Sequence, residues 1–320
     1  MPLSDNPQVV QTSENLVSTL KSAFGTPPGF RPAHAKGILL TGSFVPSTSA
    51  GLLSSAKHFN EPATPVTVRF SSSTGIPEIP DTDPNANPRG FAVRFHLGND
   101  EHGKRVHTDI ITHSTPFFPA KTGEEFLEFL QAIGNSGPDA EHPTPVEQFL
   151  ASHPKTLAFV QAPKPSPLSF ATEAYFGVNA FKLVDAKGQE TFVRYRVVPL
   201  QGVHTLDVDS LKNQDANYLY EEIVKRVQDE PVRFKLFAQV AEQGDITNDA
   251  TVHWPEKRQL AELGELTLEK VVPKTENVEE QKYIIFDPVP RVKGVEPSDD
   301  PLLDVRATLY LISGRERRSA

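Results

Sequence analysis

Alternation of apolar and polar residues over several long segments is the feature that most constrains the fold of this chain. It is present in TPVTVRFS (64–71), RGFAVRFHL (89–97) and AELGELTLEKVV (261–272). Successive side chains of a strand point to opposite faces, so this period predicts strands with one buried face. Residues 179–199 alternate on both sides of Asp185-Ala-Lys-Gly188, which predicts a hairpin that turns at this glycine.

Helical periodicity precedes and follows these segments. Apolar residues recur every three or four positions in residues 13–24, 123–133, 217–227 and 232–243. Ser13 is a candidate N-cap for the first helix. The last segment, 301–318, also fits a helix, although its β-branched residues would allow a strand. Strands gathered mainly in the first two thirds predict an α+β fold, with an antiparallel sheet or barrel and helices packed outside.

Length, charge and cysteine content limit the number of domains, the partners and the kinds of site that this chain can have. The 320 residues are within reach of one large domain, which we expect over 1–320, with residues 1–28 as an extended N-terminal arm or helix. The net charge of −9 argues against nucleic acid or an anionic membrane as the main partner. Cysteine is absent, which excludes disulfides, thiolate catalysis, iron–sulfur clusters and cysteine-ligated zinc.

The chain shows no sign of membrane insertion or export. No apolar run approaches the ~20 residues that a transmembrane helix needs. The first residues, MPLSDNPQVV, lack the basic and apolar regions of a signal peptide. We therefore expect a cytoplasmic protein, or a periplasmic one if a cleaved signal preceded this sequence.

An arginine and a tyrosine near the end of the chain are four residues apart. On a helix, Arg306 and Tyr310 would share one face, where the guanidinium would favour an ionised phenol. A tyrosinate is a known axial ligand of haem iron. The alternative is a half-buried aromatic ring with an arginine stem lying along it.

A second arginine lies in the predicted strand at VTVRFSSSTG. Arg69 and Ser71 would point to the same face of this strand, and Phe70 to the other. If that face is buried, the arginine needs an anion such as a cofactor carboxylate, and the serine could bond a histidine ring. The alternative is an edge strand with both side chains in water.

Other motifs give weaker signals. His96, His102, His107 and His113 match no compact metal-ligand spacing, so they are better explained as polar residues of two strands and their turn. The chain contains no GxGxxG or GxxxxGK[ST] pattern for nucleotides and no GxSxG elbow.

Five segments together resemble the haem-dependent catalase family. FRPAHAKGILLTGSF resembles its distal-histidine segment, and TPVTVRFSSSTG and NPRGFAVRFH resemble two of its strands. AFKLVDAKGQ is similar to a hairpin of the family. FDPVPRVKGVEPS, followed by Arg306-Ala-Thr-Leu-Tyr310, resembles its proximal segment. The order is that of the family from Phe30 to the end, which implies a catalase-like antiparallel β-barrel with helices outside.

The resemblance also implies roles for individual residues. His34 would be the distal acid–base group, and Ser71 would hydrogen-bond its ring and fix the tautomer. Tyr310, on a proximal helix over residues 301–320, would be the axial ligand of the iron, with Arg306 as its charge partner.

Haem b is the cofactor that the resemblance implies. Arg31, Arg69 and Arg317 fall where arginines of the family meet the haem propionates. Phe126 would correspond to the aromatic residue of the distal side. We also expect the chain to form a homo-oligomer, namely a dimer.

Two departures from the family pattern bear on activity. DIITHSTPFF (109–118) replaces Asp-x-x-Gly-Asn-Asn-Thr-Pro, and we align Ser114 with the asparagine that orients peroxide. A hydroxyl has one donor and is shorter than an amide, so it would hold peroxide less rigidly. The chain also lacks the long C-terminal helical part of full-size catalases. Both departures predict a small catalase-related peroxidase that reduces hydrogen peroxide or organic hydroperoxides with a small organic donor and has weak catalase activity.

Three other functions are compatible with the same motifs. The first is a true monofunctional catalase, in which Ser114 and water replace the missing amide. The second is a fatty-acid hydroperoxide isomerase similar to allene oxide synthase. The third is a haem-binding protein without turnover, although simple storage would not need His34 paired with Ser71.

Overall fold

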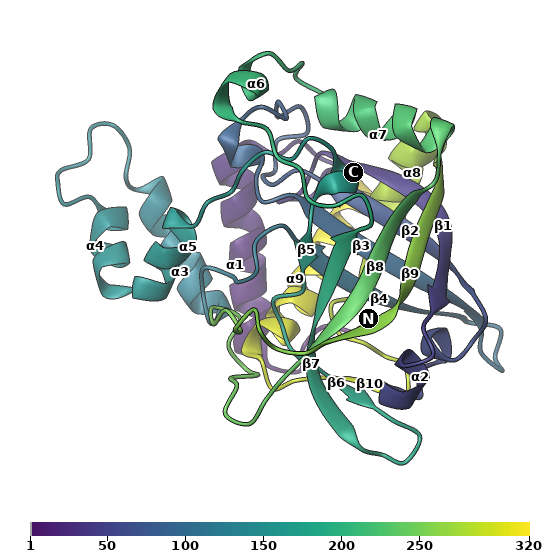
Figure 1. The fold of residues 1–320 in the computed structure, drawn as a ribbon. Coiled ribbons are helices and arrows are strands. Elements are labelled where there is room, and N and C mark those ends of the chain that lie inside the picture. Colours follow the sequence, from purple (N-terminus) through teal and green to yellow (C-terminus); the bar gives the residue numbers. More distant parts are fainter. Residues whose placement is uncertain (1) are drawn as a thin grey trace.

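A closed antiparallel barrel forms the centre of the structure, a computed structural model that describes residues 2–320 (Figure 1). The barrel runs in the order β7-β5-β4-β3-β2-β1-β9-β8 and closes where β8 pairs with β7, while β6 and β10 extend one edge. The strands are β1 (Gly37–Pro46), β2 (Thr64–Ser71), β3 (Gly90–Asn99), β4 (Arg105–His113), β5 (Tyr175–Phe176), β6 (Phe181–Val184), β7 (Glu190–Pro199), β8 (Val232–Val240), β9 (Leu260–Val271) and β10 (Val295–Pro297).

Helices pack around this barrel. The first and last long helices, α1 and α9, lie side by side although they come from opposite ends of the chain (Figure 1). Helix α3 contacts α1, and α7 lies against β9. The helices are α1 (Pro7–Phe24), α2 (Ala50–Leu53), α3 (Gly123–Gly134), α4 (Pro145–Ser152), α5 (Pro154–Gln161), α6 (Val208–Lys212), α7 (Tyr218–Asp229), α8 (Lys274–Tyr283) and α9 (Pro301–Ser319), with short 3₁₀ turns η1 (Lys57–Phe59), η2 (Pro84–Ala86) and η3 (Phe170–Thr172).

Aromatic side chains fill much of the barrel interior. Phe70 of β2 stacks on Phe170 with ring centroids 5.0 Å apart, and Phe91 of β3 meets Phe234 of β8 edge-on at 5.3 Å. All four rings are buried. Because Phe70 points into the barrel, its neighbours in β2 point to the opposite face, where the residues of the predicted site lie.

The sequence patterns agree with most of these elements. The α+β barrel, the strands over 64–71, 89–97 and 261–272, and the hairpin with Gly188 at φ 83° are confirmed. Residues 301–319 form a helix rather than a strand. Its start is set by Asp300, whose side chain accepts a hydrogen bond from the N–H of Leu302, and by Pro301 in the first turn.

Two local predictions are wrong. Residues 232–240 form strand β8 instead of a helix, and alternate residues such as Phe234, Leu236 and Ala238 are packed into the barrel. The first helix begins at Pro7 after the N-cap Asn6, so Ser13 is not its cap. The Ser13 hydroxyl donates to the carbonyl of Val9 inside the helix instead.

None of the helices within residues 2–320 combines the length and the apolar character that crossing a lipid bilayer requires. The two longest, α1 and α9, have 18 and 19 residues. Their shared interface and the contact of α1 with α3 instead place both helices against other parts of the protein.

Candidate active site

The segment between α1 and β1 places His34 over the outer face of the barrel. The backbone of His34 has φ 55°, and that of the facing Thr74 has φ 74°, conformations that residues other than glycine rarely adopt. The N–H of Ala35 donates to the carbonyl of Thr74 at 3.0 Å, which connects the two segments. Strain of this kind is concentrated at functional sites, where the surrounding structure maintains it.

The ring of His34 is fixed by the strand beneath it. Its Nδ1 lies 3.0 Å from the Ser71 hydroxyl at the end of β2. Burial and the positive charges of Arg69, Arg31, Arg306 and Arg89 lower the pKa of His34 to about 3. The imidazole is therefore neutral at physiological pH, with its Nε2 left free of the contact to Ser71.

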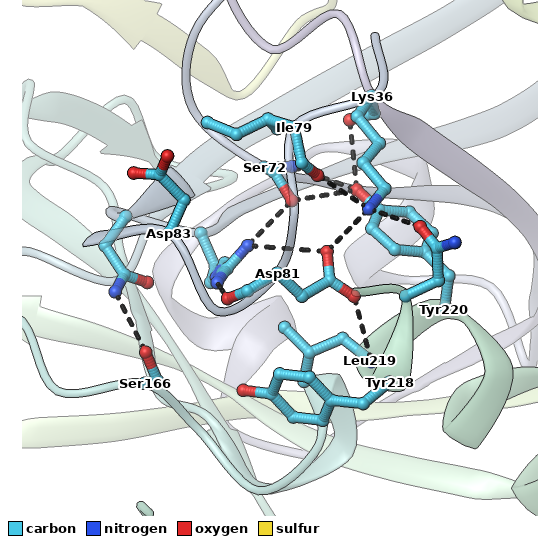
Figure 2. Close-up of polar contacts among 12 residues, drawn as sticks. Lys36, Ser72, Ile79, Asp81, Asp83, Ser166, Tyr218, Leu219 and Tyr220 are labelled. Atoms are coloured by element: carbon cyan, nitrogen blue, oxygen red, sulfur yellow. Dashed lines mark hydrogen bonds and ion pairs between the residues drawn. The ribbon is translucent and has the colours of Figure 1, made fainter. Parts of the chain in front are cut away.

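A buried ionic network holds Lys36, two residues after this histidine (Figure 2). The Asp81 carboxylate accepts hydrogen bonds from Lys36 Nζ at 2.9 Å and from the N–H of Leu219 at 3.0 Å. Arg89 donates from Nη1 to the Ser72 hydroxyl at 2.7 Å and from Nη2 to the carbonyl of Asp81. The network thus links the His34 segment, the ends of β2 and β3, and helix α7.

Replacing Asp81 with alanine should destabilise the whole domain. The Lys36 and Arg89 side chains, which are largely or fully buried, would lose their acidic partner. Removal of one member of a buried ionic group costs about 3–5 kcal/mol in unfolding free energy. Urea unfolding measures this value, with Asp209→Ala, at an exposed surface pair, as the matched control. A loss no larger than that of Asp209→Ala would show that the network contributes little.

Three arginines converge beside the His34 segment. Arg31 and Arg317 both donate to the carbonyl of Ile284, at 3.0 and 3.1 Å. Arg69 donates to the carbonyls of His34 and Ala35 at 2.9 and 3.2 Å. Within residues 2–320 the three guanidiniums donate to neutral oxygens alone, so the structure concentrates positive charge without a carboxylate to balance it.

The charges of this group act on one another. Burial and the neighbouring Arg69 and Arg317 lower the pKa of Arg31 well below its ordinary value. Burial likewise lowers the pKa of Arg69 and of Arg317 to about 10. In addition, Nε of Arg317 is buried without a hydrogen-bond partner. A buried, uncompensated cationic group with an unused donor is suited to bind an anion.

Helix α9 contributes Tyr310 and Arg306. Arg306 Nη2 donates to the Tyr310 hydroxyl at 3.2 Å, as the four-residue spacing predicts for a helix. The other terminal nitrogen of Arg306 donates to Asn179, whose amide in turn donates to Asp300 at 2.8 Å. Arg306 also lowers the pKa of His34, so the two halves of the site are electrostatically coupled although far apart in sequence.

Two predicted site residues are not brought into this group. The Ser114 hydroxyl accepts a hydrogen bond from the backbone N–H of Arg89 at 2.9 Å. Ser114 also donates its own N–H to the carbonyl of Arg89 at 2.9 Å. Phe126, on α3, packs against Phe118 with ring centroids 5.0 Å apart. Within residues 2–320, neither side chain has a hydrogen bond or a ring contact to His34 or Tyr310.

His113, the last residue of β4, lies where Ser114 was expected. It is the register partner of Gly90, and a Cβ on Gly90 would be 3.0 Å from His34 Nδ1. In the sequence, His113 is one of four histidines in two strands and their turn, and their spacing does not distinguish it from the others. The signal that could have identified it is strand alternation, because His113 and Ser114 must point to opposite faces of the sheet.

Comparisons with known proteins point to one family. The catalase family model matches residues 29–320. A catalase-related peroxidase of Synechococcus elongatus is 32% identical over 311 residues, which cover 96% of this chain and 88% of that protein. One of Mycolicibacterium paratuberculosis is 32% identical over 309 residues, covering 96% and 95%. A catalase of Pseudomonas syringae pv. syringae is 27% identical over 296 residues, covering 88% of this chain but 56% of its own length.

Proposed function

Because the chain belongs to the catalase family, we propose that it is a haem-dependent peroxidase that reduces hydrogen peroxide or organic hydroperoxides. The observation that carries this proposal is the joint placement of His34, paired with Ser71, and Tyr310, paired with Arg306, around one arginine cluster. The two relatives that this chain covers almost completely are named catalase-related peroxidases.

The arginine cluster fits the carboxylates of haem b. Two propionates would balance the charges of Arg31, Arg69 and Arg317, and Nε of Arg317 offers a buried donor that no protein atom accepts. Arginine binds carboxylates through pairs of parallel hydrogen bonds, which fix orientation as well as charge. Tyr310 would bind the haem iron through its phenolate oxygen, and Arg306 would stabilise that ionised form.

Arg31→Gln should weaken haem binding and leave the haem-free protein equally or more stable. The substitution removes one charge from a mutually repulsive group but leaves an amide that can donate to Ile284. The loss of a charge-assisted contact predicts about 10- to 100-fold weaker haem binding. Haem titration followed by absorbance, and thermal unfolding of the haem-free protein, measure the two effects. Arg105→Gln, on an exposed side chain, is the control, and an unchanged affinity would contradict propionate binding by Arg31.

His34 is the group that would move protons. Bound haem would supply the iron at which the peroxide O–O bond is cleaved. Ser71 holds Nδ1 of His34, so that Nε2 can take a proton from one peroxide oxygen and return it to the leaving oxygen. The pKa of about 3 means that this nitrogen is unprotonated and ready to accept throughout the neutral pH range.

Peroxidase activity and catalase activity differ in what happens after this first cleavage. Catalase turnover needs a second peroxide to be positioned and oxidised, whereas a peroxidase takes electrons from a small organic donor. Measuring oxygen release and dye oxidation from the same peroxide separates the two activities. We expect dye oxidation to dominate. Oxygen release close to the diffusion limit, without donor oxidation, would instead identify a true catalase.

We propose that the chain forms the homodimer that we expect. Sedimentation of the haem-loaded protein at several concentrations would distinguish a stable dimer from a monomer.

A further inference from the structure

Three neighbouring strands bring a second histidine beside His34. Ser71 of β2 is the register partner of Gly90 in β3, and Gly90 is the register partner of His113 in β4. Directly opposed residues of antiparallel strands point to the same face, with Cβ atoms about 4.5–5.5 Å apart. The three positions therefore form one row across the outer face of the barrel.

The middle position of this row is Gly90, which has no side chain to fill the space above it. A Cβ on Gly90 would lie 3.0 Å from His34 Nδ1 and 2.4 Å from Ser71 Oγ, and the second distance is shorter than Cβ atoms in proteins adopt. The ring of His34 and the hydroxyl of Ser71 thus occupy the space above Gly90. His113, on the other side of this space, is close enough for the charge of His34 to lower its pKa.

The hydrogen bonds fix different protonation patterns on the two rings. The N–H of Thr115 donates to Nδ1 of His113 at 3.1 Å. A ring nitrogen that accepts a hydrogen bond carries no proton, so the neutral ring of His113 must carry its proton on Nε2. Nδ1 of His34 instead faces a hydroxyl, which can accept from it and leave Nε2 of His34 unprotonated.

We propose that His113 Nε2–H is the hydrogen-bond donor that holds peroxide beside His34. This inference rests on the proposed function and assigns to His113 the role that sequence alignment gave to Ser114. One imidazole accepts the proton of the peroxide, and the second donates a hydrogen bond to it. Burial, followed by the charges of His34, Arg306 and Lys164, lowers the pKa of His113 to about 3, which keeps this donor neutral.

The surrounding contacts keep His113 in this position. Ser114, the next residue, is tied to both backbone groups of Arg89. Arg89 in turn donates hydrogen bonds to the Ser72 hydroxyl and to the carbonyl of Asp81. The end of β4 is thereby anchored to the same network that holds Lys36, two residues from His34.

The test compares a variant without a donor, His113→Leu, with His113→Gln, which retains an amide N–H. Cyanide binding to the ferric, haem-loaded protein is followed by the Soret shift, and the reaction with hydrogen peroxide by stopped flow. We expect His113→Leu to release cyanide about 10-fold faster and to react with peroxide about 10- to 100-fold more slowly. His113→Gln should recover most of both effects, and circular dichroism checks that each variant is folded.

Failure of this inference can be distinguished from failure of the proposed function. If the wild-type protein bound no haem, or bound it without reacting with peroxide, the proposed function would be wrong. If the wild-type protein bound haem and reacted, but His113→Leu kept the wild-type cyanide release and peroxide rates, the donor role of His113 would be overturned. Equal losses in His113→Leu and His113→Gln would also overturn it, because the amide donor would then restore nothing.

Discussion

Tyr310→Phe is expected to lose haem while the protein remains folded. Removal of a partner that only supports a metal ligand already costs about 10- to 100-fold in affinity, so loss of the axial ligand itself should cost more than ~100-fold. The substitution removes one oxygen that accepts from Arg306, and Arg306 keeps its bond to Asn179. Titration with haem, followed by the Soret band, measures the change.

Tyr283→Phe is the matched control for this experiment. Tyr283 is 46% exposed at the end of α8, and its backbone carbonyl, rather than its hydroxyl, accepts from Arg318. The control variant should bind haem as the wild-type protein does. Tyr310→Phe with wild-type affinity and an unchanged high-spin ferric spectrum would rule out Tyr310 as the axial ligand.

His34→Ala is expected to bind haem and to lose most of its reaction with peroxide. General acid–base groups contribute about 10²- to 10⁴-fold to such rates, and the loss should fall in this range. The site keeps its arginine cluster and Tyr310, so haem binding should be close to normal. The rate of peroxide consumption, measured at equal haem content, is the relevant quantity.

Two further variants make the His34 result interpretable. His34→Asn separates loss of the imidazole from backbone strain, because asparagine tolerates the positive φ of 55° better than alanine does. His102→Ala, in the exposed turn between β3 and β4, should behave as the wild-type protein. A peroxide rate in His34→Ala and His34→Asn equal to that of His102→Ala would exclude the acid–base role.

Strand alternation predicted the barrel well because one face of most strands is buried. The helical period gave the wrong prediction over 232–243, because VRFKLFAQV fits both a strand and a helical period in a short window. The closure of the barrel by pairing of β8 with β7 decides this ambiguity, and no local pattern contains that information. The N-cap was misplaced for a related reason: Ser13 is a suitable residue type, but Asn6 followed by Pro7 begins the helix earlier.

The site was predictable where it depends on a single element or on a recognised motif. The four-residue spacing gave the contact between Arg306 and Tyr310, and the resemblance gave the pairing of His34 with Ser71. His113 required the register of β3 against β4, which becomes visible only in the fold. The clustering of Arg31, Arg69 and Arg317 likewise could not be predicted from local patterns, because the three residues lie on segments that only the folded chain brings together.

The absorption spectrum of the purified protein, recorded before and after addition of haem b, tests the central claim most directly. We expect one haem per chain, a Soret band and the features of high-spin ferric iron with a tyrosinate ligand. A protein that binds no haem after reconstitution would contradict the proposed peroxidase, the roles of Tyr310 and Arg31, and the pairing of His34 with His113 around peroxide.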